Sequence, residues 1–181
     1  MSAVSNSLSL LADFGGADEE TLTLATANAE TLLARLRFFR AAFGSDGPIA
    51  DAAAAKKLTE DYLRSVENRS AVFSCVWETA PDVPLPFCRL MLLGAQIAAE
   101  TLIRGGTITI KATRDAVSVR AEGAVVKSDS DAVAFLKGTL DQPTPKAAPA
   151  LFADAFAKEN GLTAAAASDA SAFNLTFSRN G

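Results

Sequence analysis

The chain of 181 residues is 49% apolar and 21% charged, and its net charge of -4 is spread along the sequence. This is the composition of a globular protein. It argues against nucleic acid as a partner, because phosphate binding needs clustered Lys and Arg. The start "MSAVSNSLSLLADFGG" lacks the basic region and cleavage site of a signal peptide, and no apolar run approaches the length of about 18 residues that a membrane span needs. We therefore expect a cytoplasmic protein that does not enter a membrane.

Two helices come first in chain order. Val4, Leu8 and Leu11 mark a short helix that ends at the turn Gly15-Gly16, and a longer helix begins at the N-cap Asp18 and stops at Gly44. The longer helix carries an apolar seam in alternating steps of three and four residues: Leu22, Ala25, Ala29, Leu32, Leu36, Phe39 and Phe43. This spacing is typical of coiled coils and four-helix bundles.

A hairpin of two helices cannot bury both sides of such a seam, so the sequence predicts that two copies pair into a dimeric four-helix bundle. Residues 1–45 form this unit in our interpretation. Its predicted dimer seam comprises Leu8, Leu11, Leu22, Leu32, Leu36 and Phe39. The alternative is that the seam packs on the rest of the same chain.

The two helices of the hairpin differ in length. At 1.5 Å per residue the second would be roughly 39 Å long and the part of the first that is present only about 18 Å. The end from Arg37 to Phe43 therefore extends beyond its partner. Uncovered phenylalanines there would form an exposed apolar patch, which usually marks a binding surface or a missing piece of structure.

We expect residues 46–181 to form a second unit that contains both helices and strands. We expect a short strand at 48–51, an amphipathic helix at 52–66, a strand at 70–77 and a buried helix at 87–103. Strands follow at 107–113 and 116–122, helices at about 131–140 and 149–160, and a closing strand at 171–178. This order predicts an α+β fold, a two-layer sandwich with helices on one face of a mixed sheet.

Motifs for independent catalysis are missing from the sequence. There is no histidine, and Cys75 and Cys88 have neither a zinc spacing nor a disulfide framework, so both are expected to be buried thiols. No Walker A loop, GxSxG elbow or Cys-His pair occurs. We expect no metal.

The segment "ARLRFFRAAFG", the helical hairpin before it, and the buried helix that runs into "RGGTITI" resemble the ChpT-type histidine phosphotransferases of alphaproteobacterial phosphorelays. The resemblance covers nearly the whole chain. It implies a dimeric bundle like the phosphoacceptor domain of a histidine kinase, followed by a degenerate kinase ATPase-like domain that has lost nucleotide binding.

The kinase-like part departs from the pattern of an active kinase. Aligned on Gly105-Gly106, the two Mg-binding asparagines of a kinase fall on Leu93 and Ile97, which cannot bind a metal. The adenine-reading Asp-x-Gly-x-Gly box falls on residues 121–125, with Ala121 in place of the aspartate. The resemblance therefore implies that no ATP and no other cofactor is bound.

The phosphoacceptor is the second departure. The family carries a His-Asp pair near the start of the first helix, and this chain begins after that point. Two explanations stay open: the true start lies upstream, or this member lacks transfer chemistry. The resemblance places Arg37 and Arg40 beside the phosphoryl group. It places Ser5, Ser9 and Phe38 where a receiver domain docks.

Other roles are open for this helix end. Phe38 could pack on the α+β domain instead, or both arginines could be solvated and all three phenylalanines be core. The implied function is histidine phosphotransfer between receiver domains of response regulators, including those of a hybrid kinase, with the acceptor histidine absent from the chain. The alternative is a non-catalytic dimeric adaptor that binds or sequesters a receiver domain.

Overall fold

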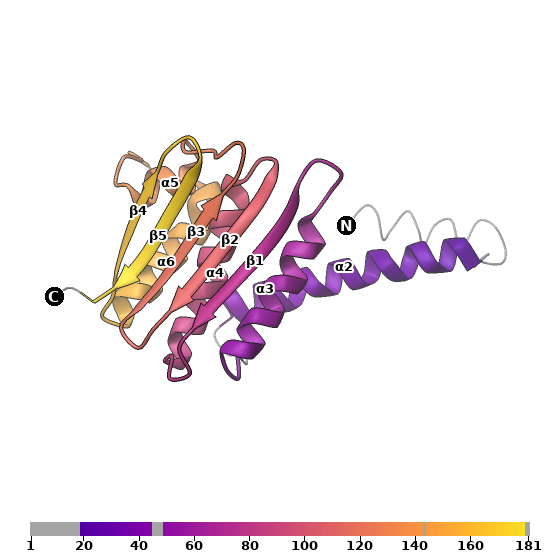
Figure 1. The fold of residues 1–181 in the computed structure, drawn as a ribbon, viewed down its shortest axis with the longest axis horizontal. Coiled ribbons are helices and arrows are strands. Elements are labelled where there is room, and N and C mark those ends of the chain that lie inside the picture. Colours follow the sequence, from indigo (N-terminus) through magenta and orange to yellow (C-terminus); the bar gives the residue numbers. More distant parts are fainter. Residues whose placement is uncertain (1–18, 45–48, 143, 180–181) are drawn as a thin grey trace.

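The computed structural model describes residues 19–44, 49–142 and 144–179 (Figure 1). Its elements are α2 (Glu19–Phe43), α3 (Ala52–Val66), β1 (Val72–Thr79), α4 (Leu85–Thr101), β2 (Gly105–Ala112), β3 (Ala116–Glu122), α5 (Asp131–Leu136), the 3-10 helix η1 (Pro145–Ala147), α6 (Ala148–Glu159), β4 (Thr163–Ser168) and β5 (Ala172–Ser178). The predicted α+β class is confirmed. The first helix of the predicted hairpin lies outside the described residues, and the division at 45/46 stays a prediction.

The strands form one sheet in the order β1-β2-β3-β5-β4. β1 runs parallel to β2, and the other neighbours are antiparallel. Side chains alternate between the two faces of a sheet, so the register places the apolar residues of the central strands on one face. That face carries Ile108, Ile110, Val117, Val119, Ala121, Phe173, Leu175 and Phe177, all buried.

The helices cover this apolar face of the sheet, as Figure 1 shows. α4 packs on β2, β3 and β5, α3 on α4 and β1, and α6 on α4 and β4. α4 is buried along almost its whole length. It also approaches the sheet closely, because a Cβ on Gly94 would lie 2.7 Å from Cγ2 of Val119. The core therefore lies between α4 and the sheet.

The pair Gly105-Gly106 begins β2 in a backbone conformation that favours glycine. The φ angles are +72° and +147°. A Cβ on Gly105 would lie 2.0 Å from the carbonyl oxygen of Val72, and one on Gly106 would lie 2.1 Å from that of Glu122. Both glycines are therefore needed where β2 meets its two neighbours.

The C-terminal part of α2 contacts α3 and α4, and its N-terminal part projects beyond the sandwich (Figure 1). No helix in the described ranges combines the length and apolar character that crossing a bilayer requires.

Two element predictions were wrong. The predicted strand at 48–51 does not occur in its described part: residues 49 and 50 lie outside regular elements, and Asp51 caps α3 by accepting a hydrogen bond of 2.7 Å from the Ala54 amide. β4 was missed. Its four consecutive alanines have low strand propensity, and only the pairing with β5 makes them a strand.

Candidate functional site

The C-terminal end of α2 is held in the core of the α/β unit. Phe38, Ala41 and Ala42 are its buried residues. The Phe38 ring stacks on Tyr62 of α3, with centroids 4.0 Å apart and planes at 15°. Burial of the phenol raises the pKa of Tyr62 to about 12. This side of α2 is therefore an intramolecular interface.

Two arginines add polar contacts to that interface. Arg35 donates from Nη2 to the backbone oxygen of Ser65 and from Nε to Oγ of Ser65 at 3.4 Å. Arg89 of α4 donates from Nη2 to the carbonyl oxygen of Gly44 at 2.7 Å, and its guanidinium carbon lies 4.8 Å from the ring centroid of Phe156. The end of α2 is thus fixed to both α3 and α4.

The predicted docking role of Phe38 was wrong. Its side chain is 0% exposed, so it offers no surface to a receiver domain. The structure instead bears out the other role considered for it, packing on the α/β domain. Sequence analysis also missed Arg35 as a contact to α3. The helical period could have found it, because positions three apart on a helix, such as 35 and 38, share a side.

The seam residues of α2 lie on the other side of the helix. Leu22, Leu36 and Phe39 are 50%, 54% and 38% exposed, and Leu32 is half-buried. At about 100° per residue, Leu36 and Phe38 point roughly 160° apart, so Leu36 faces away from α3. The C-terminal end of the seam does contact the α/β unit, because the Phe39 ring lies 5.8 Å from that of Tyr62 and the Phe43 ring 5.1 Å from that of Phe152. The α/β unit therefore covers part of the seam and leaves Leu22 and Leu36 exposed. Leu8, Leu11, Ser5 and Ser9 lie outside the described residues.

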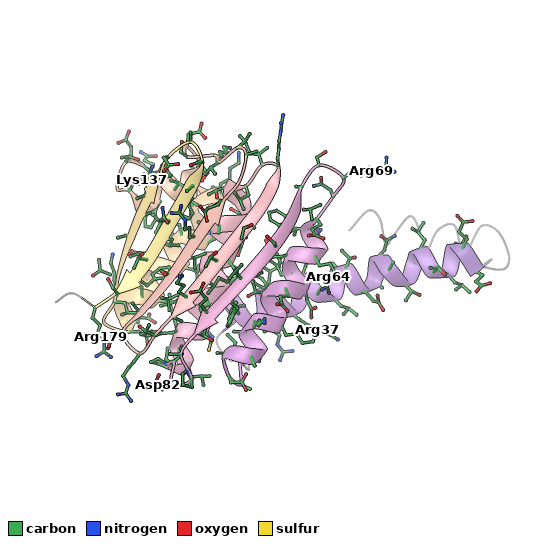
Figure 2. The ribbon with its side chains drawn as sticks, in the orientation of Figure 1. Arg37, Arg64, Arg69, Asp82, Lys137 and Arg179 are labelled. Carbon is green, nitrogen blue, oxygen red and sulfur yellow. The ribbon has the colours of Figure 1, made fainter. Side chains whose placement is uncertain are left out.

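Arg37 and Arg40 are both exposed on α2. Arg37 lines a groove of about 600 Å³ between α2 and α3, together with Glu30, Asp61 and Arg64. Figure 2 labels Arg37 and Arg64. Arg64 has a partner in Asp61, at 3.5 Å between Nη1 and Oδ1. Among the described residues no ion pair within 4.0 Å involves Arg37 or Arg40, so their charges are available to an anion.

The positions aligned with a kinase nucleotide site are core positions here. Leu93, Ile97 and Ala121 are each 0% exposed. In the described part of the chain no group of three or more His, Cys, Asp or Glu side chains is placed to hold a metal ion.

Sequence comparisons identify the family. The family model described as "Histidine phosphotransferase C-terminal domain" matches residues 52–172, from α3 to the start of β5. The chain is also similar to protein phosphotransferase ChpT of Brucella abortus (strain 2308), with 33% identity over 150 residues, which are 80% of this chain and 63% of that protein. The chain thus spans less than two thirds of the length of that relative.

Solved structures agree on the fold. A bacterial phosphotransferase matches over 97% of this chain and 86% of its own, with a TM-score of 0.78 at 23% identity. A histidine kinase domain from Erythrobacter litoralis matches over 98% and 95%, with a TM-score of 0.50 at 11% identity. Because the family model covers most of the chain and a relative is 33% identical over 80% of it, the chain belongs to the ChpT-type histidine phosphotransferase family.

Proposed function

We propose that this chain is a histidine-phosphotransfer protein of a two-component phosphorelay, and that it docks the receiver domains of response regulators. The observation that carries the proposal is the exposed seam of α2 in a member of this family: the α/β unit holds one side of the helix through Phe38 and leaves Leu22 and Leu36 exposed on the other. An apolar face of this kind needs a protein partner.

The first partner is a second copy of the chain. Two copies of the hairpin would bury the seam in a four-helix bundle, which is the simplest closed arrangement for such helices. The second partner is a receiver domain, bound on the bundle face near Ser5, Ser9 and Arg40. The interfaces of transient signalling pairs bury less than about 1,200 Å² of surface, so we expect micromolar affinity for the receiver domain.

The phosphoryl group would be held by Arg37 and Arg40, whose guanidinium groups have no carboxylate partner among the described residues. Guanidinium groups bind phosphoryl oxygens through charge-assisted hydrogen bonds. Transfer to and from a receiver aspartate also needs an imidazole nitrogen as nucleophile. The 181 residues contain no histidine, so this group must come from outside them.

The count of zero histidines favours a second candidate, a dimeric adaptor that binds or sequesters a receiver domain without accepting phosphate. The adaptor needs the same seam and the same docking face. It differs from the relay protein only in the transfer step.

The deciding experiment compares the 181-residue chain with a version extended upstream to include any encoded His-Asp pair. Under the relay proposal, only the extended chain accepts phosphate from a phosphorylated receiver domain, with the acid lability of phosphohistidine. Under the adaptor proposal no upstream histidine is encoded, and the 181-residue chain still binds a receiver domain. If neither version binds any receiver domain from its own organism, both proposals fail.

Arginine variants of the extended chain test the phosphoryl site. Arg37→Ala or Arg40→Ala should slow transfer roughly 10- to 100-fold, because each removes one hydrogen bond to a charged group, while the dimer persists. Arg69→Ala is the matched control. It removes an exposed arginine from the connection between α3 and β1, which Figure 2 places well away from Arg37. Equal slowing by Arg69→Ala would contradict the assignment.

A further inference from the structure

Phe152 of α6 extends the apolar surface of the seam. Its side chain is 51% exposed, which makes it the most exposed phenylalanine of the described residues. Its ring meets that of Phe43 edge-on at 5.1 Å, and the Phe43 ring lies 6.1 Å from that of Phe39. Phe39 and Phe43 belong to the seam of α2. The three rings therefore form a continuous aromatic strip that runs from the seam onto α6.

A hollow of about 290 Å³ lies beside this aromatic strip. Phe43, Phe152 and Phe156 line it, with Arg89 and Glu159 as its charged residues. Arg89 is already engaged, because it donates to the end of α2 and its guanidinium carbon lies 4.8 Å from the ring centroid of Phe156. The hollow is smaller than most small-molecule sites, which occupy about 300–1,000 Å³, and its aromatic walls suit a side chain of a protein partner.

A helix packed on the end of the seam would also cover Phe152. An α-helix with its side chains is about 10–12 Å across, and packed helices lie about 8–10 Å apart. The 5.1 Å between the rings of Phe43 and Phe152 is well within that width. Phe152 is 51% exposed and Leu36 is 54% exposed, so α6 offers a partner an apolar residue as accessible as one of the seam.

We propose that the aromatic strip is part of the dimer interface, so that α6 contacts the second copy of the chain through Phe152. The second copy is the occupant that the geometry favours, because the strip continues the predicted dimer seam without a gap. The first helix of the same chain, predicted to be only about 18 Å long, would not reach this end of α2. The proposal rests on the dimer of the proposed function and extends its interface from the bundle helices to the α/β unit.

The test compares the dimer dissociation constants of the 181-residue chain and its variants, measured by analytical ultracentrifugation. Phe152→Ala should raise the constant at least tenfold, because a two-fold dimer loses the contact twice. Ile103→Ala is the matched control. It removes a side chain that is 55% exposed from the connection between α4 and β2, and it should leave the constant unchanged. An unchanged constant in Phe152→Ala, or an equal rise in Ile103→Ala, overturns the proposal.

Two further measurements separate this contact from the bundle on which it rests. If Leu36→Asp dissociates the dimer and Phe152→Ala leaves it intact, the bundle stands and the contact through α6 is refuted, whereas a monomeric parent chain refutes both. A photoreactive benzoylphenylalanine in place of Phe152 should crosslink to the second copy, and one in place of Ile103 should not. If Phe152→Ala weakens only the binding of a receiver domain, the strip serves that partner and the proposal is overturned.

Discussion

Truncating Phe38 tests which face of α2 belongs to the core of the chain. The ring is 0% exposed, stacks on Tyr62 with centroids 4.0 Å apart, and meets Phe39 edge-on at 5.8 Å. Removing a buried phenylalanine costs about 3–5 kcal/mol, of which the aromatic pairing supplies about 0.5–1.5 kcal/mol. We therefore expect Phe38→Ala to lower the free energy of unfolding by about 3–5 kcal/mol. The loss should not depend on protein concentration, because the broken contacts lie within one chain.

Phe39→Ala is the matched control, since it makes the same change one residue further on. Phe39 is 38% exposed, and its ring meets Tyr62 edge-on at 5.8 Å, so its loss within one chain should be smaller than that of Phe38, about 1–2 kcal/mol. Its larger effect should be on dimerisation, which makes the measured stability depend on protein concentration. Urea unfolding followed by the fluorescence of Trp77, the single tryptophan, at two concentrations measures both effects. Equal losses in the two variants at every concentration would refute the assignment of the faces.

Three further outcomes are expected. Leu36→Asp should give a monomer by light scattering, because it places a charge in the seam. Leu24→Asp lies off the seam and should leave the dimer intact. A parent chain that is monomeric at micromolar concentration would contradict the bundle. Calorimetry should detect no ATP binding, because Leu93 and Ile97 stand where Mg ligands would be. A dissociation constant below about 100 μM, which corresponds to a binding free energy of about 5.5 kcal/mol, would show that the alignment is wrong. Burial raises the pKa of Tyr62 to about 12, so this group contributes stability that is present below its ordinary pKa of about 10 and is lost as the pH rises toward 12, on the order of 2–3 kcal/mol. Tyr62→Phe should remove this part of the pH dependence, and an unchanged alkaline profile would contradict it.

The sequence predicts best the elements whose local signals agree with their surroundings. α3 was predicted with the bounds that the structure gives, Ala52–Val66, because its amphipathic period marks the buried face. The cap at Asp51 was not recognised, because this residue was assigned to the predicted strand at 48–51. β3 was likewise predicted over Ala116–Glu122, because its apolar and polar residues alternate along the strand. β4 has no local signal, because alanine does not distinguish a strand from a helix, and its strand state depends on the pairing with β5.

The candidate site was predicted only in part, and Phe38 shows why. The heptad pattern correctly separates Phe38 from the seam residues Leu36 and Phe39, since they differ in helical phase. It cannot say what lies against the other face, because the partner of Phe38 is Tyr62, on another helix. Contacts of this kind depend on the packing of α2 against α3, which no local pattern encodes.

The interior of α4 bears on the placement of α2. A metal-binding asparagine at position 93 or 97 would bury an amide among apolar side chains, and an unsatisfied buried polar group costs about 1–3 kcal/mol. The present leucine and isoleucine instead pack the helix against the sheet, and from the same helix Arg89 reaches the carbonyl oxygen of Gly44 at the end of α2. Leu93 and Ile97, at the positions aligned with the Mg-binding asparagines of a kinase, thus belong to the buried helix that also contacts the end of α2. We infer that the α/β unit serves this family member as the element that orients the exposed seam and its arginines.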